Sequence, residues 1–180
     1  MISSPALVSR ATKLREAFDK ERAAPASGCG DEQTESFLAI RVSKDSYAIR
    51  ASEISGLTVG RKIVRLPSPV PELLGIAGVR GVLVPVYSLA ALLGYGAEND
   101  EPRWLALSGT EDCIALAFDG FESYLRIPLA NVYAAEKNKT AGSHITHVAR
   151  GADTVRGVVS IPLVKATIQE RCHRGVSKER

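Results

Sequence analysis

The sequence predicts a mainly β fold. Short runs in which apolar and polar residues alternate are separated by turn residues at intervals of about ten, as barrels and sandwiches require. These candidate strands follow one another as a meander and do not alternate with long helices, which excludes a helix-covered parallel sheet. The chain of 180 residues, 45% apolar and 24% charged, is long enough to bury a core in one domain or in two fused lobes.

An amphipathic helix is expected in residues 1–22. Ser4 followed by proline is a typical helix start, and apolar residues then recur at spacings of three and four. Its apolar stripe could pack on the body of the protein or on a partner helix. Residues 23–35 are small, polar and proline-bearing, so we interpret them as a linker. The folded domain is expected to span residues 36–168, with 169–180 as a C-terminal tail.

The first strands of the domain are predicted to form a hairpin. Apolar residues alternate over 38–42, polar residues 43–46 supply the turn, and the alternation resumes at Tyr47. Further strands are expected at 62–66, 81–87, 103–108, 113–118, 122–127 and 155–161.

Two short helices interrupt the strands. Ser88 is a capping residue for Leu89–Leu93, with Gly94 just past the end, and Pro162 begins a helix over 162–171. Pro85 lies inside the strand 81–87 and removes one hydrogen-bond donor from it. That strand is therefore expected at a sheet edge or at a bulge.

Charge and cysteine content exclude several classes of protein. A net charge of +3 from 23 basic and 20 acidic residues is too small and too evenly mixed for an electrostatic nucleic-acid binder, and Arg103 with Trp104 is a single stacking platform. Cys29, Cys113 and Cys172 lie far apart, which argues against a disulfide or zinc framework and for a reducing compartment. We expect a cytoplasmic protein, without a secretory signal, that does not insert into a membrane.

No catalytic or cofactor-binding motif is apparent. The spacing Gly75-x-x-Gly78-x-x-Gly81 fits neither phosphate-loop pattern, and a Gly-x-Ser-x-Gly nucleophile motif is absent. The glycines are better explained by sharp turns and close backbone approach. Carboxylates in the β region fall in turns or at segment ends, as solvated charges do. The sequence therefore predicts neither an enzyme nor a cofactor.

Three histidines were weighed as metal ligands. His144 and His147 would share a face only in a helix, which their β-branched neighbours make doubtful, and His173 beside Cys172 offers one further pair. No carboxylate stands at a suitable spacing to complete a site. We expect solvent-exposed loop histidines and no bound metal.

None of the catalytic, cofactor, metal or nucleic-acid sites considered above explains Arg80. It stands alone among glycines and valines, immediately before the strand that contains Pro85. An arginine in such a setting suits a protein interface, because its planar group forms paired hydrogen bonds. An intramolecular ion pair with Glu72 or Asp119 is an equally weighted alternative.

The segment around Arg80 resembles the CheW-like family, the coupling proteins of bacterial chemotaxis. The segment RLPSPVPELLGIAGVRGVLVPVYSLAALLG, residues 65–94, carries the strongest match. The opening FLAIRVSKDSYAIRASEI, the segment IALAFDGFESYLRIP and the last strand VRGVVSIPLV are also similar to the family pattern. The resemblance runs from about Phe37 to about Thr167.

This resemblance implies two intertwined five-stranded SH3-like barrels and an adaptor without catalytic activity. It implies as partners the regulatory domain of the chemotaxis histidine kinase and the cytoplasmic tip of chemoreceptors, with no nucleic acid. We expect these protein contacts on the glycine-arginine segment and on the barrel ends: Gly78, Val79, Arg80, Gly81, Val84, Pro85 and Leu57.

The sequence also departs from the family pattern. The family usually has Asn-Leu-Arg-Gly at residues 78–81, an acidic residue in place of Gly56 and an aspartate in place of Ser88. A divergent coupling protein of a specialised system, such as pilus-linked motility, would show this pattern. The alternative from another class is a small-molecule-binding protein or degenerate enzyme that uses a groove between the two β lobes.

Overall fold

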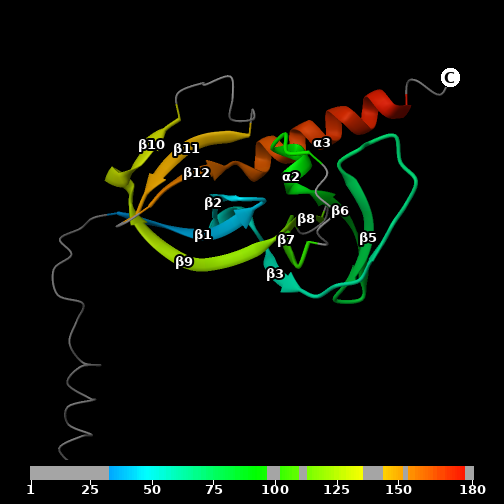
Figure 1. Ribbon diagram of the computed structural model, residues 1–180, viewed down its shortest axis with the longest axis horizontal. Coiled ribbons are helices and arrows are strands. Elements are labelled where there is room, and N and C mark those ends of the chain that lie inside the picture. The colour runs from blue at the N-terminus through cyan, green and yellow to red at the C-terminus, as the bar shows by residue number, and fades with distance from the viewer. Residues whose placement is uncertain (1–32, 97–101, 110–112, 136–143, 152–153, 177–180) are drawn as a thin grey trace, which may run out of the picture. The chain divides into compact units, whose positions relative to one another are not determined.

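The computed structural model describes residues 33–96, 102–109, 113–135, 144–151 and 154–176 (Figure 1). The chain divides into residues 1–32 and 33–180, and all described residues belong to the second unit. The predicted N-terminal helix and most of the predicted linker lie outside the described residues. Strands and turns dominate the described part, which confirms the mainly β prediction.

One six-stranded sheet, sheet A, joins strands from both ends of the described chain. Its spatial order is β10-β11-β12-β2-β1-β9, and β12 pairs with β2 in parallel while the other neighbours are antiparallel. The strands are β1 (Thr34–Val42), β2 (Asp45–Arg50), β9 (Gly120–Pro128), β10 (Val132–Ala134), β11 (Ile145–Arg150) and β12 (Val155–Val159).

The second sheet, sheet B, contains the middle of the chain. Its order is β3-β7-β8-β6-β5-β4, and the β6–β8 pair is parallel while the other pairs are antiparallel. The strands are β3 (Gly56–Val59), β4 (Ile63–Val64), β5 (Leu73–Val79), β6 (Val82–Ser88), β7 (Trp104–Ser108) and β8 (Ile114–Phe118).

The two sheets repeat one topology. In each, three antiparallel strands that are consecutive in the chain (β10-β11-β12 or β4-β5-β6) meet a second antiparallel group through a parallel pair. The outermost strands of each sheet are also consecutive in the chain, as they are in a barrel. Two β lobes were implied by the resemblance, with five strands each. The sixth strand in each sheet is a short one, β4 or β10, at topologically equivalent edges.

Short helices connect and cover the sheets. They are the 3-10 helices η1 (Ala51–Glu53) and η2 (Leu129–Asn131) and the α-helices α2 (Leu89–Leu92) and α3 (Ile161–Val176). The Ser88 hydroxyl accepts a hydrogen bond from the Ala91 amide at 3.2 Å, so the predicted cap of α2 is confirmed. None of the described helices is long and apolar enough to cross a membrane.

Three apolar clusters make up the core. The largest, the central core, lies between the sheets and includes Leu38 and Ile49 of sheet A, Leu116 of sheet B, Leu89 of α2 and Val164 of α3. The other two lie on the opposite faces of the sheets, one lined by β5–β8 and one by sheet A. Each sheet therefore buries one face in its own apolar cluster. Part of its other face is buried in the central core, which the two sheets share.

Sequence reasoning missed four strands, β3, β5, β10 and β11. Sharp turns and close backbone approach were the two roles expected of the glycines in β5. The β5 segment is a strand and not a turn, whereas the expected close approach is confirmed at Gly75. A Cβ at Gly75, where φ is +144°, would lie 2.0 Å from the Val64 carbonyl oxygen. Only glycine lets β4 approach β5 at this position.

The predicted edge position of Pro85 is wrong for the strand as a whole. Strand β6 lies inside sheet B, between β5 and β8, and the bulge falls in β5 between Leu73 and Gly75. The ladder with β8 begins at Val86, so β6 has only one paired neighbour at Pro85. The missing amide of proline is therefore tolerated within an internal strand.

Carboxylates expected to be solvated instead attach α3 to the body. The Glu53 carboxylate accepts a hydrogen bond from the Ile161 amide at 2.7 Å, at the start of the helix. Glu72 is only 6% exposed and forms an ion pair with Arg171 of α3. Helix α3 continues to Val176, so the domain boundary predicted at Ile168 falls within it.

Replacing Gly75 with alanine should destabilise the domain strongly. The added Cβ meets backbone that cannot move without separating β4 from β5, so we expect a loss of roughly 3 kcal/mol or more in the free energy of unfolding. Urea denaturation measures this loss. Gly78→Ala in the same strand is the matched control, because a Cβ there meets nothing within 4 Å. Equal stability of the two variants would contradict the close-approach argument.

Candidate protein-binding site

Arg80 occupies a strained position at the turn between β5 and β6. Val79 and Val82 are directly paired, so Arg80 and Gly81 form a two-residue loop, with φ of 51° and 82°. Positive φ at both central residues matches the twist of a hairpin, and Asn-Gly is the usual sequence there. Arginine in the left-handed region costs about 1 kcal/mol. Such an outlier points to a role for the side chain outside local folding.

Neither predicted ion pair of Arg80 forms. Glu72 is paired with Arg171, and the Asp119 carboxylate accepts the Ser43 amide. Arg80 is exposed and makes no ion pair with any described residue. Its guanidinium lies beside β3, with Nη2 3.6 Å from the position that a Cβ would take at Gly56. The intramolecular alternative weighed for Arg80 is therefore wrong within the described residues.

The predicted binding residues divide into exposed and buried groups. Gly78 and Gly81 are exposed beside Arg80, and Pro85 is half-buried. Val79 and Val84 are only 5% and 3% exposed, because they face the interior of sheet B. They support the turn from inside and offer no surface to a partner. Leu57, on β3, is half-buried and packs against the central core.

The most exposed apolar side chains near Arg80 were missed. Val82 is 61% exposed and Leu83 is 70% exposed, at the start of β6. On β4, Val64 is 52% exposed. The alternation of β6 contained the signal for Leu83, since Val84 and Val86 point inward and odd-numbered neighbours point outward. For β4, the sequence predicts a strand at 62–66 but does not indicate which of its residues point outward.

Val64 and Leu83 belong to one continuous surface across three strands. Val64 is the register partner of Ile76, which is the partner of Pro85, and Leu83 stands opposite Gly78. Cross-strand partners lie on the same face of a sheet, so an apolar row crosses β4, β5 and β6 beside the Arg80 turn. We call this the Arg80 surface; it comprises Val64, Ile76, Gly78, Arg80, Gly81, Leu83 and Pro85. Val82 pairs with Val79 and lies on the opposite face of the sheet.

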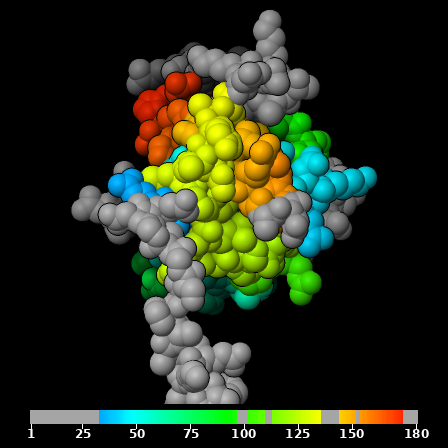
Figure 2. Space-filling model, turned by 90° about the vertical axis from the view of Figure 1, so that its left-hand side faces the viewer, coloured from blue at the N-terminus to red at the C-terminus, as the bar shows by residue number. Residues whose placement is uncertain are grey.

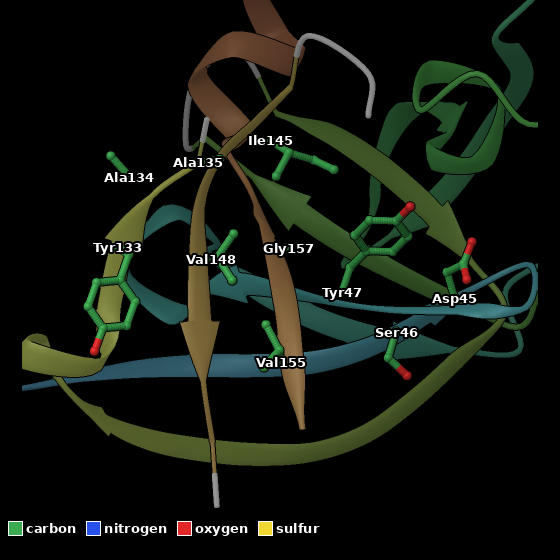
Figure 3. A pocket seen from close by; sticks show the side chains of 10 residues that line it. All are labelled: Asp45, Ser46, Tyr47, Tyr133, Ala134, Ala135, Ile145, Val148, Val155 and Gly157. Atoms are coloured by element: carbon green, nitrogen blue, oxygen red, sulfur yellow. The ribbon is translucent and has the colours of Figure 1, made fainter. Parts of the chain in front are cut away.

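A second apolar surface occupies the equivalent place in sheet A. Tyr133, Val148, Gly157 and Tyr47 are successive register partners across β10, β11, β12 and β2. They line an open groove of about 670 Å³, in which Val148 and Gly157 lie between the two tyrosines (Figure 3). Figure 2 shows β9 and β10 (yellow) beside β11 and β12 (orange) on this side of the molecule. The groove lies on one sheet and not between the lobes.

Two residues that line this groove make a polar contact with Tyr95. The Tyr95 hydroxyl donates to the Asp45 carboxylate, and the Tyr47 and Tyr95 hydroxyl oxygens lie 2.5 Å apart. Burial and these two hydrogen bonds raise the pKa of Tyr95, so it stays protonated as a donor. Because Tyr95 follows α2, the contact attaches that helix to β2 of sheet A.

The prediction of solvent-exposed histidines is wrong for His144. Its side chain is 2% exposed and fills the space between β11 and the helices, with Nε2 3.0 Å from the Thr167 hydroxyl oxygen of α3. Burial lowers the pKa of His144, although a hydrogen bond to the Leu92 backbone opposes the shift. His147 lies on β11 and is half-buried. Among the described residues, no cluster of His, Cys, Asp or Glu could hold a metal ion.

Comparison with known proteins gives a consistent result. A family model described as the CheW-like domain matches residues 36–170. Among solved structures, the chain is similar to the scaffolding protein TtCheW from Thermoanaerobacter tengcongensis, with a TM-score of 0.65 and 14% identity over 72% of this chain and 90% of that chain. At this identity, the likeness shows the fold. No curated protein matches the chain.

Arg80→Asn should leave the domain at least as stable as the natural protein. Asparagine tolerates the left-handed turn conformation better than arginine, so we expect a gain of up to about 1 kcal/mol in the free energy of unfolding. Equilibrium urea denaturation measures it. The same replacement at Arg126, which is exposed on β9, should destabilise, because asparagine is unfavourable in strands. A clear loss of stability in Arg80→Asn would show that the arginine side chain stabilises the fold.

Acidification should destabilise the domain through His144. The lowered pKa means that the unfolded chain binds a proton at this residue more readily, so stability falls as the pH drops below the unfolded value of about 6.5. Thermal unfolding between pH 8 and pH 5 measures the effect. His144→Gln should flatten this pH dependence, whereas His147→Gln should preserve it. An unchanged pH profile in His144→Gln would contradict the assignment.

Proposed function

Because the chain belongs to the CheW-like domain family, we propose that it is an adaptor that couples chemoreceptors to the histidine kinase of a chemotaxis-type signalling system. The family consists of non-enzymatic scaffold proteins of chemotaxis. The observation that carries the proposal is the family match over residues 36–170, which covers both sheets and most of α3. The expected partners are the regulatory domain of the kinase and the cytoplasmic tip of the receptors, and the expected location is the cytoplasm.

The Arg80 surface supports this proposal as the contact region for one partner. Its strands are held rigidly by the ladder, so little conformational entropy is lost on binding. Exposed apolar side chains beside an arginine form the composition that interfaces favour. Leu83 and Val64 would supply the apolar contact and Arg80 the directional hydrogen bonds.

The departures from the family pattern leave this contact available. An acidic residue at the position of Gly56 would stand directly beside the Arg80 guanidinium and would pair with it. Glycine at this position leaves the guanidinium free to pair with an acidic or carbonyl group of a partner. Serine in place of the usual aspartate at residue 88 still caps α2, so this change keeps the local structure.

Arg80→Glu should weaken a partner complex while the domain stays folded. Loss of an interface arginine that makes paired hydrogen bonds raises the dissociation constant about tenfold or more. Calorimetric titration of the full chain with the kinase regulatory domain and with the receptor tip, both from the source organism, measures the change. Circular dichroism of the variant checks that the fold is retained.

Arg126→Glu is the matched control, since Arg126 is exposed on β9 of sheet A, away from the Arg80 surface. It should bind both partners as the natural protein does. Binding of Arg80→Glu at full affinity would contradict the role of Arg80. Absence of any complex between the natural protein and either partner would contradict the proposed function itself.

A further inference from the structure

The groove of sheet A crosses strands whose backbone hydrogen bonds are already used. Strands β11, β12 and β2 each lie between two paired neighbours. The groove runs across them from Tyr133 to Tyr47, a span of three inter-strand spacings or about 14 Å. A partner segment that lies along the groove therefore meets side chains and cannot join the sheet as a further strand.

A glycine forms the floor of the groove. A Cβ at Gly157 would lie 3.2 Å from Ile145 Cγ2 and 3.5 Å from Tyr47 Cδ1, so a side chain here would fill the space between them. Val148 is the register partner of Gly157 on the other side, and Tyr133 follows it (Figure 3). The result is an apolar notch between two tyrosine rings, which suits a compact apolar group.

Hydrogen bonds hold the ring of Tyr47 in one orientation. Tyr95 gives its hydroxyl hydrogen to Asp45, so the hydrogen between the Tyr47 and Tyr95 oxygens, 2.5 Å apart, belongs to Tyr47. The two rings also meet edge to face, with centroids 6.5 Å apart. This wall of the groove is therefore already ordered, and a partner that packs against it loses little side-chain entropy there.

The middle of the groove offers no hydrogen-bond acceptor to a peptide amide. It is lined by the apolar side chains of Ile145, Val148 and Val155 together with Gly157. An amide N–H buried there without a partner costs about 1–3 kcal/mol. Proline has an apolar ring and no N–H, so a proline-rich segment avoids this cost. Such a segment rises about 3.1 Å per residue in its extended helix, so about four or five residues span the groove.

One exposed carboxylate stands at the Tyr47 end of the groove. Asp45 and Val155 each precede the Tyr47–Gly157 register pair by two residues, on parallel strands, so they lie at the same level of the sheet. Figure 3 shows Asp45 beyond Tyr47, on the side away from Tyr133. Asp45 is exposed and forms no ion pair with a described residue.

This carboxylate is suited to pair with a basic group of a partner. One of its oxygens accepts the Tyr95 hydroxyl, which leaves the other for a charge-assisted hydrogen bond. Residues 136–143, which join β10 to β11 and lie outside the described ranges, contain one acidic and two basic residues. Recognition of a basic group would therefore depend on the placed carboxylate and not on the net charge of this side of the molecule.

We propose that the groove of sheet A binds an extended, proline-rich segment of a partner protein, with an arginine or lysine at the end that reaches Asp45. The prolines pack over Gly157 between Tyr133 and Tyr47. Grooves lined by aromatic side chains bind such segments because the extended helix is formed before binding and loses little entropy. This site is separate from the Arg80 surface, and it does not depend on the adaptor role.

Titration of the isotope-labelled full chain with a synthetic peptide, followed by NMR, tests the proposal. The probe is the amidated peptide Arg-Pro-Leu-Pro-Pro-Leu-Pro, and the comparison peptide has alanine in place of each proline. We expect the amide signals of Val148 and Gly157 to shift, with a dissociation constant of roughly 10–500 μM for the probe and about tenfold weaker binding of the alanine peptide. Absence of a saturable shift at up to about 2 mM probe would overturn the proposal.

Variants of the groove identify the residues that bind. Tyr133→Ala should raise the dissociation constant about tenfold, whereas Tyr124→Ala, which removes a tyrosine 54% exposed on β9 and outside the groove, should leave it unchanged. Gly157→Ala places a Cβ in the notch and should also weaken binding. Unchanged amide signals away from the groove show that each variant keeps the fold. Equal binding by the Tyr133→Ala and Tyr124→Ala variants would contradict the site.

Asp45→Asn tests the basic end of the segment, because asparagine keeps an acceptor for Tyr95 but has no charge. It should weaken binding of the probe about threefold or more and leave a peptide with norleucine in place of arginine unaffected. The same loss with both peptides would show that Asp45 recognises no basic residue, which contradicts the stated chemistry of the partner.

The same measurements distinguish two other occupants. The chain carries its own largely exposed proline-bearing segment at residues 65–71. Self-association in sedimentation experiments that Tyr133→Ala abolishes would assign the groove to a second copy and overturn the proposal. Tighter binding of the alanine peptide than of the probe would indicate a helical partner and would overturn it as well. Neither result bears on whether the chain binds a kinase or a receptor.

Discussion

The central core between the two sheets is the constraint on which the remaining structure depends. Residues of β1, β2 and β12 meet residues of β7 and β8 there, and α2 and α3 close its sides. Because each sheet has only part of its outer face in this contact, the rest of that face must stay open or be covered by something else. The open parts are the Arg80 surface of sheet B and the tyrosine-lined groove of sheet A. A scaffold can use both without rearranging its core.

The Arg80 turn shows how a local strain is maintained by its surroundings. The β5–β6 ladder fixes the two-residue loop, and the inward-facing Val79 and Val84 hold the ladder against the interior of sheet B. The turn therefore keeps its left-handed backbone although arginine does not favour it. The Arg80 side chain lies beside Gly56 and forms no ion pair with any described residue. Its guanidinium is therefore available for contact with another protein.

Three polar contacts attach α3, at the C-terminal end of the domain, to the rest of the structure. Glu53 holds its first turn, Glu72 pairs with Arg171 farther along, and His144, just before β11, contacts Thr167. Glu72 and His144 are themselves buried, so removing the partner of either leaves a desolvated polar group without compensation. From Ile161 to Arg171, helix α3 is therefore an integral part of the domain.

The sequence by itself determined the β class, the first hairpin, the cap of α2 and the lone arginine as the residue of interest, because alternation, turn residues and capping are local properties. It misassigned β5 and β11 and the surroundings of Glu72 and His144. Whether a glycine-rich or histidine-bearing segment becomes a strand depends on which distant strand pairs with it, as Val64 pairs with Ile76. The tertiary structure alone decided that Val79 and Val84 point inward while Leu83 stays exposed, and that no described carboxylate reaches Arg80. These outcomes depend on sheet register and on packing between residues far apart in the chain, and neither is encoded in a local pattern.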